Sequence, residues 1–331
     1  MSLVLYFRSC LLSMFTPPPG PFEIPSLVYQ FLSSPQKFVA SYVYTVILAL
    51  RGSSITPPTT TSRIRLVCIS DTHTHRANIP NGDILIHAGD MCNVGTHAEL
   101  QDQVNWLNSL PHSHKLLVAG NHDSYLDPQS RVRTDEGKHI DWRGVTYLQH
   151  STAHLNFEAK GGRRLDVYGA PQIPVCGGKD FAFQYHRQED KWSNTIPDHT
   201  DILITHTPPR YHLDLPHNMG CGWLLKEVWR IQPRVHVFGH VHAGHGMQHV
   251  WWDQCQSAYE RICSRGERGV LSDLFDVPMW MDSLKMLLFG GQSVIWSRLW
   301  GGDDGGSVMV NASLTYLSTG KLGNPPQIVD I

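Results

Sequence analysis

The chain of 331 residues has no C-x-x-C pair, and its seven cysteines are scattered along the sequence. A disulfide framework or a zinc ribbon needs paired or regularly spaced cysteines, so this pattern argues against both and favours the reduced thiols of an intracellular protein. The chain also lacks an excess of positive charge, because 27 Lys and Arg stand against 29 Asp and Glu, a formal net charge of -2. The overall charge therefore gives no signal for a nucleic-acid partner.

No apolar run reaches the roughly 20 residues that a membrane-spanning helix needs. Residues 3–15 are apolar but contain Arg8, a pattern unlike that of a signal peptide. Residues 38–50 are uncharged, and two interpretations of them stay open. They form either a core helix or a helix packed on the domain surface, or else a segment that lies in a membrane interface, flanked by Lys37 and Arg51. We expect an intracellular, cytoplasmic protein, with peripheral membrane contact as the alternative.

The rest of the composition suits a globular protein, with 41% hydrophobic and 17% charged residues. Residues 52–62 read as a Pro/Ser/Thr linker, after which short aliphatic runs alternate with helical stretches. We therefore predict an apolar N-terminal extension and linker at 1–62 and an α/β domain at 63–331. The predicted strands are 64–70, 83–87, 115–119, 201–205 and 234–238, and the predicted helices include 97–110 and 223–231.

Each of these strands ends in side chains of the kinds that bind metals. The five strand ends are Asp71-Thr72-His73, Gly89-Asp90, Gly120-Asn121-His122-Asp123, His206 and Gly239-His240-Val241-His242. Functional groups of α/β sheets collect beyond the carboxyl ends of the strands, so we expect these side chains to meet. Their mixed nitrogen and oxygen donors suit Mn, Fe or Zn better than Ca. Two such ions about 3.5–4 Å apart clamp the attacking and leaving oxygens of a phosphoryl displacement.

The five strand ends carry, in this order, D-x-H, G-D, G-N-H-D, a single His and G-H-x-H. This set resembles the motifs of the calcineurin-like metallophosphoesterases over about 63–248. Within that superfamily the chain is similar to the MPPED-like (metallophosphoesterase-domain-containing) subfamily, in 218–246 and in Val310-Asn311-Ala312-Ser313. The resemblance implies an α/β fold of four layers, in which two mixed β-sheets pack as a sandwich and are flanked by helices.

Carried over residue by residue, the resemblance implies two divalent metal ions. Asp71, His73 and His242 would hold one ion, Asn121, His206 and His240 the other, and Asp90 would bridge both. His122 corresponds to the family's general acid, and Asp123 to either an orienting carboxylate or a helix cap. The attacking group would be a metal-bridging hydroxide, so no protein nucleophile is needed.

The resemblance also has departures that bear on the substrate. Calcineurin-type protein phosphatases carry G-D-x-x-D-R-G, and the stretch 89–95 lacks both the second Asp and the Arg that grips phosphate. The chain keeps both His240 and His242 of G-H-x-H, which favours an active enzyme. Its complete set of motifs resembles that of cyclic-nucleotide-type phosphodiesterases, and this resemblance implies a phosphodiesterase acting on a phosphate-ester small molecule such as a nucleotide. The alternatives are a phosphomonoesterase, a protein phosphatase, or a weakly active nucleotide-binding or scaffold protein that retains the metals. Arg76 and Arg210 are either phosphate contacts or solvated loop residues.

An insertion at about 249–307 separates G-H-x-H from the V-N-A-S strand, which lie close together in the subfamily. The insertion is predicted to form a pair of helices, of which 253–268 is polar, whereas 279–300 is strongly apolar and rich in Trp. Three interpretations stay open. The insertion packs on the N-terminal extension, forms a peripheral membrane contact together with 38–50, or acts as a substrate lid. The sequence leaves the oligomeric state open.

Overall fold

The structure is a computed structural model that describes residues 15–18, 20, 22–56, 62–267, 269–301 and 305–331. The chain divides into two compact units. The helical unit comprises Met1–Ser54, Leu215–Asn218 and His249–Gly306, and the sandwich unit comprises Ile55–Asp214, Met219–Gln248 and Ser307–Ile331. The predicted boundaries at 62 and at 249–307 stay a prediction.

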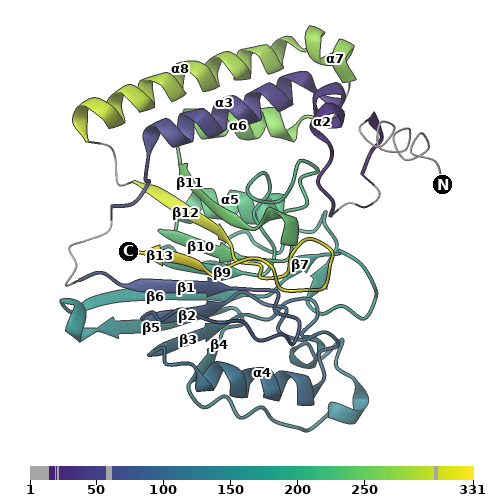
Figure 1. Ribbon diagram of the computed structural model, residues 1–331, viewed down its shortest axis with the longest axis vertical. Helices are drawn as coiled ribbons and strands as arrows, with labels where there is room; N and C mark the ends of the chain where they lie inside the picture. Colours follow the sequence, from purple (N-terminus) through teal and green to yellow (C-terminus); the bar gives the residue numbers. More distant parts are fainter. Residues whose placement is uncertain (1–14, 19, 21, 57–61, 268, 302–304) are drawn as a thin grey trace, which may run out of the picture. The chain divides into compact units, whose positions relative to one another are not determined.

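The first sheet of the sandwich unit has five strands in the order β13-β1-β2-β3-β4 (Figure 1). Strands β1 to β4 are parallel to one another, and β13 runs antiparallel to β1, so the sheet is mixed. The bounds are β1 Arg65–Ile69, β2 Ile84–His87, β3 His114–Leu117, β4 Val145–Tyr147 and β13 Gln327–Asp330.

The second sheet has six strands in the order β11-β12-β10-β9-β6-β5. Strands β6, β9, β10 and β12 are parallel, and β5 pairs with β6 in the antiparallel direction. The bounds are β5 Ser151–Phe157, β6 Arg163–Ala170, β9 Ile202–Thr205, β10 Val235–Phe238, β11 Gly246–Trp251 and β12 Gly306–Asn311. A further pair consists of β7 Ile173–Pro174 and β8 Gln184–Tyr185.

Successive residues of β1 serve two different cores, because side chains alternate between the faces of a strand. Leu66 and Cys68 lie in a cluster that also contains residues of β6, β9 and β10, which places this core between the two sheets. Val67 and Ile69 lie in a second cluster with α4 (His97–Ser109). A strand buried on both faces reads as a continuous apolar run, which is why these strands could be predicted.

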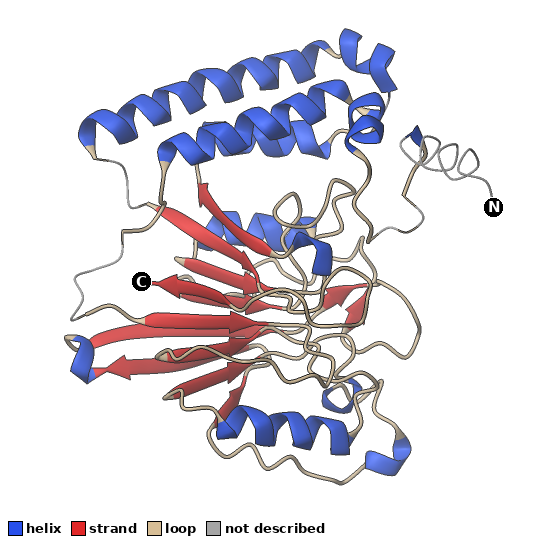
Figure 2. Ribbon diagram, viewed as in Figure 1, coloured by secondary structure: helices blue, strands red, loops and turns tan. Residues whose placement is uncertain are grey.

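Helices flank the two sheets, as Figure 2 shows. Helix α4 begins after Thr96, whose side chain accepts a hydrogen bond from the backbone N–H of Glu99, a cap that stabilises a helix by about 1 kcal/mol. Helix α5 (Gly222–Ile231) buries Leu224 and Val228 and ends before Pro233. Short 3-10 helices lie in the connections, η1 Ser124–Leu126, η2 Arg133–Asp135, η3 Glu158–Lys160 and η4 His242–Gly244. The predicted sandwich of two mixed sheets flanked by helices is confirmed.

The helical unit combines the N-terminal extension with the insertion. Its helices are α2 Leu27–Ser33, α3 Pro35–Arg51, α6 Gln254–Ser264, α7 Gly269–Phe275 and α8 Val277–Trp300. Helices α3, α6 and α8 share a core that includes Ile47, Ala258 and Met286, and the ring of Tyr44 stacks on that of Tyr259 at 3.9 Å. The packing that the first interpretation of the insertion describes is therefore present. Among the described helices, none combines the length and the apolar character needed to cross a membrane.

Candidate metal centre

The loops after β1, β2, β3, β9 and β10 bring their polar side chains together. Three groups each offer ligand atoms that lie within 4.8 Å of one another. The groups are Asp71, His73 and His242; His73, Asp90 and His122; and Asp90, His206 and His240. Because the first two share His73 and the last two share Asp90, the three groups form one continuous centre, to which both sheets contribute.

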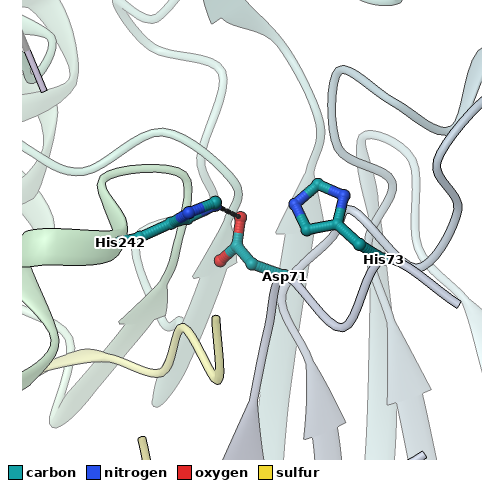
Figure 3. A group of neighbouring side chains, drawn as sticks. All are labelled: Asp71, His73 and His242. Atoms are coloured by element: carbon teal, nitrogen blue, oxygen red, sulfur yellow. Dashed lines mark ion pairs between the residues drawn. The ribbon is translucent and has the colours of Figure 1, made fainter. Parts of the chain in front are cut away.

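Asp71 and His242 connect the two sheets within this centre (Figure 3). Asp71 follows β1, His242 follows β10, and the His242 Nε2 atom lies 3.3 Å from Asp71 Oδ1. Burial alone would raise the pKa of the Asp71 carboxyl, but the hydrogen bond and the charge of His242 hold it below its ordinary value. Figure 3 also shows the His73 ring beside this pair.

Asp90 occupies the position shared by two of the groups. Its Oδ2 atom lies 3.3 Å from His206 Nε2, and its Oδ1 atom accepts a hydrogen bond of 2.7 Å from the backbone N–H of His122. Asn121, which is not a titratable ligand, also belongs to this part of the centre, because its Oδ1 atom lies 3.1 Å from His206 Nε2. The structure thus brings together all eight residues for which metal binding or acid catalysis was predicted. Asp123, for which an orienting or capping role was considered, is not one of these eight.

Main-chain carbonyl groups orient four of the imidazole rings. The Nδ1 atom of His73 lies 3.2 Å from the carbonyl oxygen of Cys92, and that of His122 lies 2.7 Å from the carbonyl oxygen of Asn93. The Nδ1 atom of His206 lies 2.8 Å from the carbonyl oxygen of Ala88, and that of His242 lies 2.9 Å from the carbonyl oxygen of Leu317. A carbonyl oxygen can only accept, so each Nδ1 must carry the hydrogen. In the neutral ring Nε2 then keeps its lone pair, which is the arrangement that metal-binding histidines show.

Asp123 makes contacts that fit neither of the two roles considered for it. Its carboxylate accepts hydrogen bonds from the backbone N–H groups of Gly120, at 2.8 Å, and Cys92, at 3.0 Å. It stands at the N-cap of η1 but makes no side-chain cap bond there, and the ring of His122 is oriented by the Asn93 carbonyl instead. Burial, together with the charge of Asp90, raises the pKa of Asp123 to about 6. Asp123 therefore joins the loops that follow β2 and β3.

The backbone turns sharply at four of the predicted ligands. Asp71, His73, Asp90 and His240 have φ angles of 53°, 45°, 55° and 66°. This left-handed region is uncommon for residues other than glycine, and such strain concentrates at functional sites where the surrounding structure enforces it. At Asp71 and His73 the turn is held by hydrogen bonds from their N–H groups to the carbonyls of Gly89 and Asp90.

Two glycines leave space for the carboxylates of the centre. A Cβ atom on Gly120 would lie 2.2 Å from Asp90 Oδ1, and one on Gly239 would lie 2.2 Å from Asp71 Oδ2. Real side chains do not approach so closely, so any larger residue would displace the carboxylate. The positions before Asn121 and His240 therefore have to be glycine, because only glycine leaves room there for the carboxylates of Asp90 and Asp71.

We expect Gly120→Ala to weaken metal binding by about 10- to 100-fold, the loss typical of disturbed groups around metal ligands. The added methyl group would push the Asp90 carboxylate away from His206, at the point where two of the groups meet. Metal content after dialysis, measured by plasma emission spectrometry, checks this result. Gly178→Ala is the control, because a Cβ there meets nothing within 4 Å. Equal metal content in both variants would contradict the assigned role of Gly120.

The electrostatics of the centre depend on carboxylate and imidazole pairs. Burial would lower the pKa of His206, but the charge and hydrogen bond of Asp90 outweigh it and raise the pKa to about 9. For His240, burial and the neighbouring charge of His206 lower the pKa to about 3. Without a cation, Asp90 is thus neutralised by a protonated imidazole. A metal ligand must be unprotonated, so a divalent cation that binds here takes the place of that proton.

Several contacts of this centre could not be read from the sequence. The ring of Phe181 lies 4.7 Å from that of His122, and its loop is fixed by a hydrogen bond from the Ala182 N–H to the Asn121 carbonyl. The carbonyls of Asn93 and Leu317, which orient two of the rings, are also new. No sequence signal could have found the carbonyls, because every residue has one.

The two arginines considered as phosphate contacts differ in their surroundings. Arg76 donates two hydrogen bonds, of 2.7 and 2.8 Å, to the carboxylate of Asp102, and both side chains are more than half exposed. The guanidinium of Arg210 lies over the ring of Tyr211 at 5.3 Å. No ion pair between Arg210 and a carboxylate occurs within the described part of the chain. Arg76 is therefore already paired with a carboxylate, whereas Arg210 forms no ion pair, although its charge acts to lower the pKa of the buried Asp214.

Comparison with known proteins identifies the family. Residues 64–244, which contain all of these strand ends, match the family model described as calcineurin-like phosphoesterase. The chain belongs to this family. The resemblance carried by the five motifs is thereby confirmed, and the His and Asp clusters of this calcineurin-like phosphoesterase are able to hold metal ions.

Similar proteins occur in animals and fungi. Metallophosphoesterase domain-containing protein 1 of Homo sapiens is 38% identical over 204 residues, which cover 55% of this chain and 62% of that protein. A UPF0046 protein of Caenorhabditis elegans is also 38% identical, over 59% of this chain and 70% of its own length. A protein of Emericella nidulans named probable rhamnogalacturonate lyase C is 43% identical over 70% of this chain, but the match spans only 22% of that protein.

Proposed function

We propose that this calcineurin-like phosphoesterase is a metal-dependent phosphodiesterase that hydrolyses small phosphate esters. The observation that carries the proposal is the position of Asp90, whose carboxylate belongs to two ligand groups at once. A carboxylate has two oxygens and a full negative charge, so it can serve two cations that lie side by side. Mixed nitrogen and oxygen donors of this kind favour Mn, Fe or Zn.

The ligands divide between two ions in the way that the three groups suggest. One cation would be held by Asp71, His73 and His242, and the other by Asn121, His206 and His240. Asp90 would be a ligand of both cations. Two divalent cations, when bound, polarise the phosphoryl oxygens and lower the pKa of water enough to supply the nucleophile near neutral pH. The protein contributes the orientation of its donors, since carbonyl groups fix the Nδ1 atoms of the rings.

His122 is the residue that we assign to proton transfer. Its Nδ1 donates to the Asn93 carbonyl, and its backbone N–H donates to Asp90, so the ring has a fixed position beside the ligands. The ring of Phe181 lies against it. In its protonated form, Nε2–H gives its proton to the leaving alkoxide oxygen as the bond to phosphorus breaks.

The charge around the centre supports a diester over a monoester. A monoester substrate carries up to two negative charges, whereas a diester carries one, so a monoesterase benefits more from additional cationic groups. The stretch 89–95 lacks the Arg of the protein phosphatases, and Arg76 is neutralised by Asp102. Of the two arginines, Arg210 is then the remaining candidate for a contact to the substrate phosphate. One such cation besides the metals suits a substrate with a single negative charge.

The proposal is tested with protein that has been stripped by a chelator and reloaded with Mn²⁺. We expect kcat/KM for bis(p-nitrophenyl) phosphate to exceed that for p-nitrophenyl phosphate by about tenfold or more, which corresponds to at least 1.4 kcal/mol of transition-state discrimination. The stripped protein should be inactive. Faster turnover of the monoester would make the protein a phosphomonoesterase. Bound metal without turnover of either compound would make it a binding protein.

A further inference from the structure

Helix α8 is apolar on almost every side, yet it buries only a narrow stripe. The buried positions are Met279, Asp282, Met286 and Gly290, spaced at helical intervals. At Gly290 the helix approaches its neighbours so closely that a Cβ atom would lie 2.5 Å from Ile47. Most of the other large apolar side chains are exposed, among them Trp280, Met281, Leu284, Leu287, Leu288, Ile295, Trp296, Leu299 and Trp300, whereas Val294 packs on the core. A helix that is apolar all round is normally covered on all sides.

Neighbouring helices extend this exposed face. On α3, Val39, Tyr42, Val46 and Leu50 lie three or four residues apart and are all exposed, opposite the stripe that packs inward. On α7, Val270, Leu271, Leu274 and Phe275 are exposed as well. Most of the exposed large apolar side chains of the described residues lie on the helical unit. We refer to these side chains of α3, α7 and α8 as the apolar helical surface.

The charges of these helices are distributed unevenly. Helices α3, α7 and α8 contain two acidic residues, Asp273 and Asp282, and both are buried. Asp273 accepts hydrogen bonds from Ser34 and Gln36, and Asp282 pairs with Arg261 and Arg265. Both carboxylates of these helices are thus held inside the unit, Asp273 by hydrogen bonds and Asp282 by ion pairs, and neither faces solvent.

Positive charge, in contrast, faces solvent on the same helices. Lys285 and Arg298 are exposed on α8, and Lys37 is half-buried on α3. Within the described residues, none of the three has a carboxylate within ion-pair distance. Arg298 donates to the carbonyl oxygen of Leu50, at 3.0 Å. The three helices therefore carry cations without an ion-pair partner and no exposed anion, which is complementary to a surface that is apolar inside and negatively charged outside.

We infer that the apolar helical surface binds the face of an anionic phospholipid membrane. Helix α8 has 24 residues, so it is about 36 Å long and would lie in the plane of the interface. Trp280 stands near one end, and Trp296 and Trp300 at the other, each more than half exposed. Tryptophan and lysine or arginine are the residues that anchor helices at the level of the lipid headgroups.

The experiment measures sedimentation of the full chain with vesicles of phosphatidylcholine and phosphatidylserine at low salt. We expect the protein to sediment with these vesicles, and less with vesicles of phosphatidylcholine alone or at high salt. Leu288→Glu should weaken binding by about tenfold or more, because it replaces an inserted apolar side chain with a charged one. Lys285→Glu should weaken it by about fivefold or more through charge alone.

Val132→Glu is the matched control, since Val132 is an exposed valine of the sandwich unit and should leave binding unchanged. Circular dichroism and melting temperature verify that each variant is folded. The inference is overturned if the protein stays in the supernatant, or if Leu288→Glu binds as well as the unchanged chain. It is also overturned if the chain is a dimer without vesicle binding that Leu288→Glu converts to monomer, because a second copy would then be the occupant.

Discussion

Asp90→Asn is expected to abolish turnover and to remove most of the bound metal. An amide has the shape of the carboxylate but no negative charge, so it cannot serve two cations or balance the imidazole of His206, 3.3 Å away. The amide NH₂ group, if it faces the backbone N–H of His122, would also place a donor against a donor. Metal content by plasma emission spectrometry and turnover of bis(p-nitrophenyl) phosphate check both effects.

Asp141→Asn serves as the control for this substitution. The Asp141 carboxylate lies 2.8 Å from Arg143 and is 62% exposed, so the loss of its charge should change neither metal content nor turnover. Near-normal turnover of Asp90→Asn with two bound metals would contradict a dinuclear centre bridged by Asp90.

His122→Ala is expected to keep its metal and to lose about 10²–10⁴-fold in turnover, the range typical of a positioned general acid. The His122 ring lies in one group with His73 and Asp90, but the predicted ligand sets of both ions are complete without it. The loss should be largest for diesters of poor leaving groups, because p-nitrophenolate departs without needing a proton. Single-turnover rates for an alkyl and a p-nitrophenyl diester measure this difference.

His199→Ala is the control for this prediction, since His199 is an exposed loop residue. Loss of metal from His122→Ala would make His122 a ligand, in line with its place in one of the three groups. An equal loss for good and poor leaving groups would instead assign the ring to phosphate binding.

The sandwich could be predicted because its central strands are buried on both faces. Such strands read as short aliphatic runs, and β1, β2, β3, β9 and β10 all lie within two residues of the predicted positions. Strands β4, β5, β6, β11 and β13 and the short pair β7 and β8 were not predicted. In β5, exposed and buried residues are mixed, and β4 has only three residues, so neither produces a clear apolar run.

The helical unit shows where local pattern was insufficient. The sequence predicted helices at 38–50, 253–268 and 279–300, and left open whether they pack together, touch a membrane or form a lid. Their packing depends on contacts between residues more than 200 positions apart, such as Ile47 and Met286 in one core. Periodicity indicates that a helix has an apolar face, but it does not identify what covers that face.

What the sequence determined by itself is the set of side chains at the centre, because each one lies in the loop that follows a strand and brings its own chemistry to the sheet edge. Only the tertiary structure decided how these side chains are held. The carbonyls of Asn93 and Leu317 orient two imidazoles, and Asp102 neutralises Arg76. The physical reason is that a main-chain carbonyl has no residue identity, and an ion pair between loops depends on where the chain returns in space.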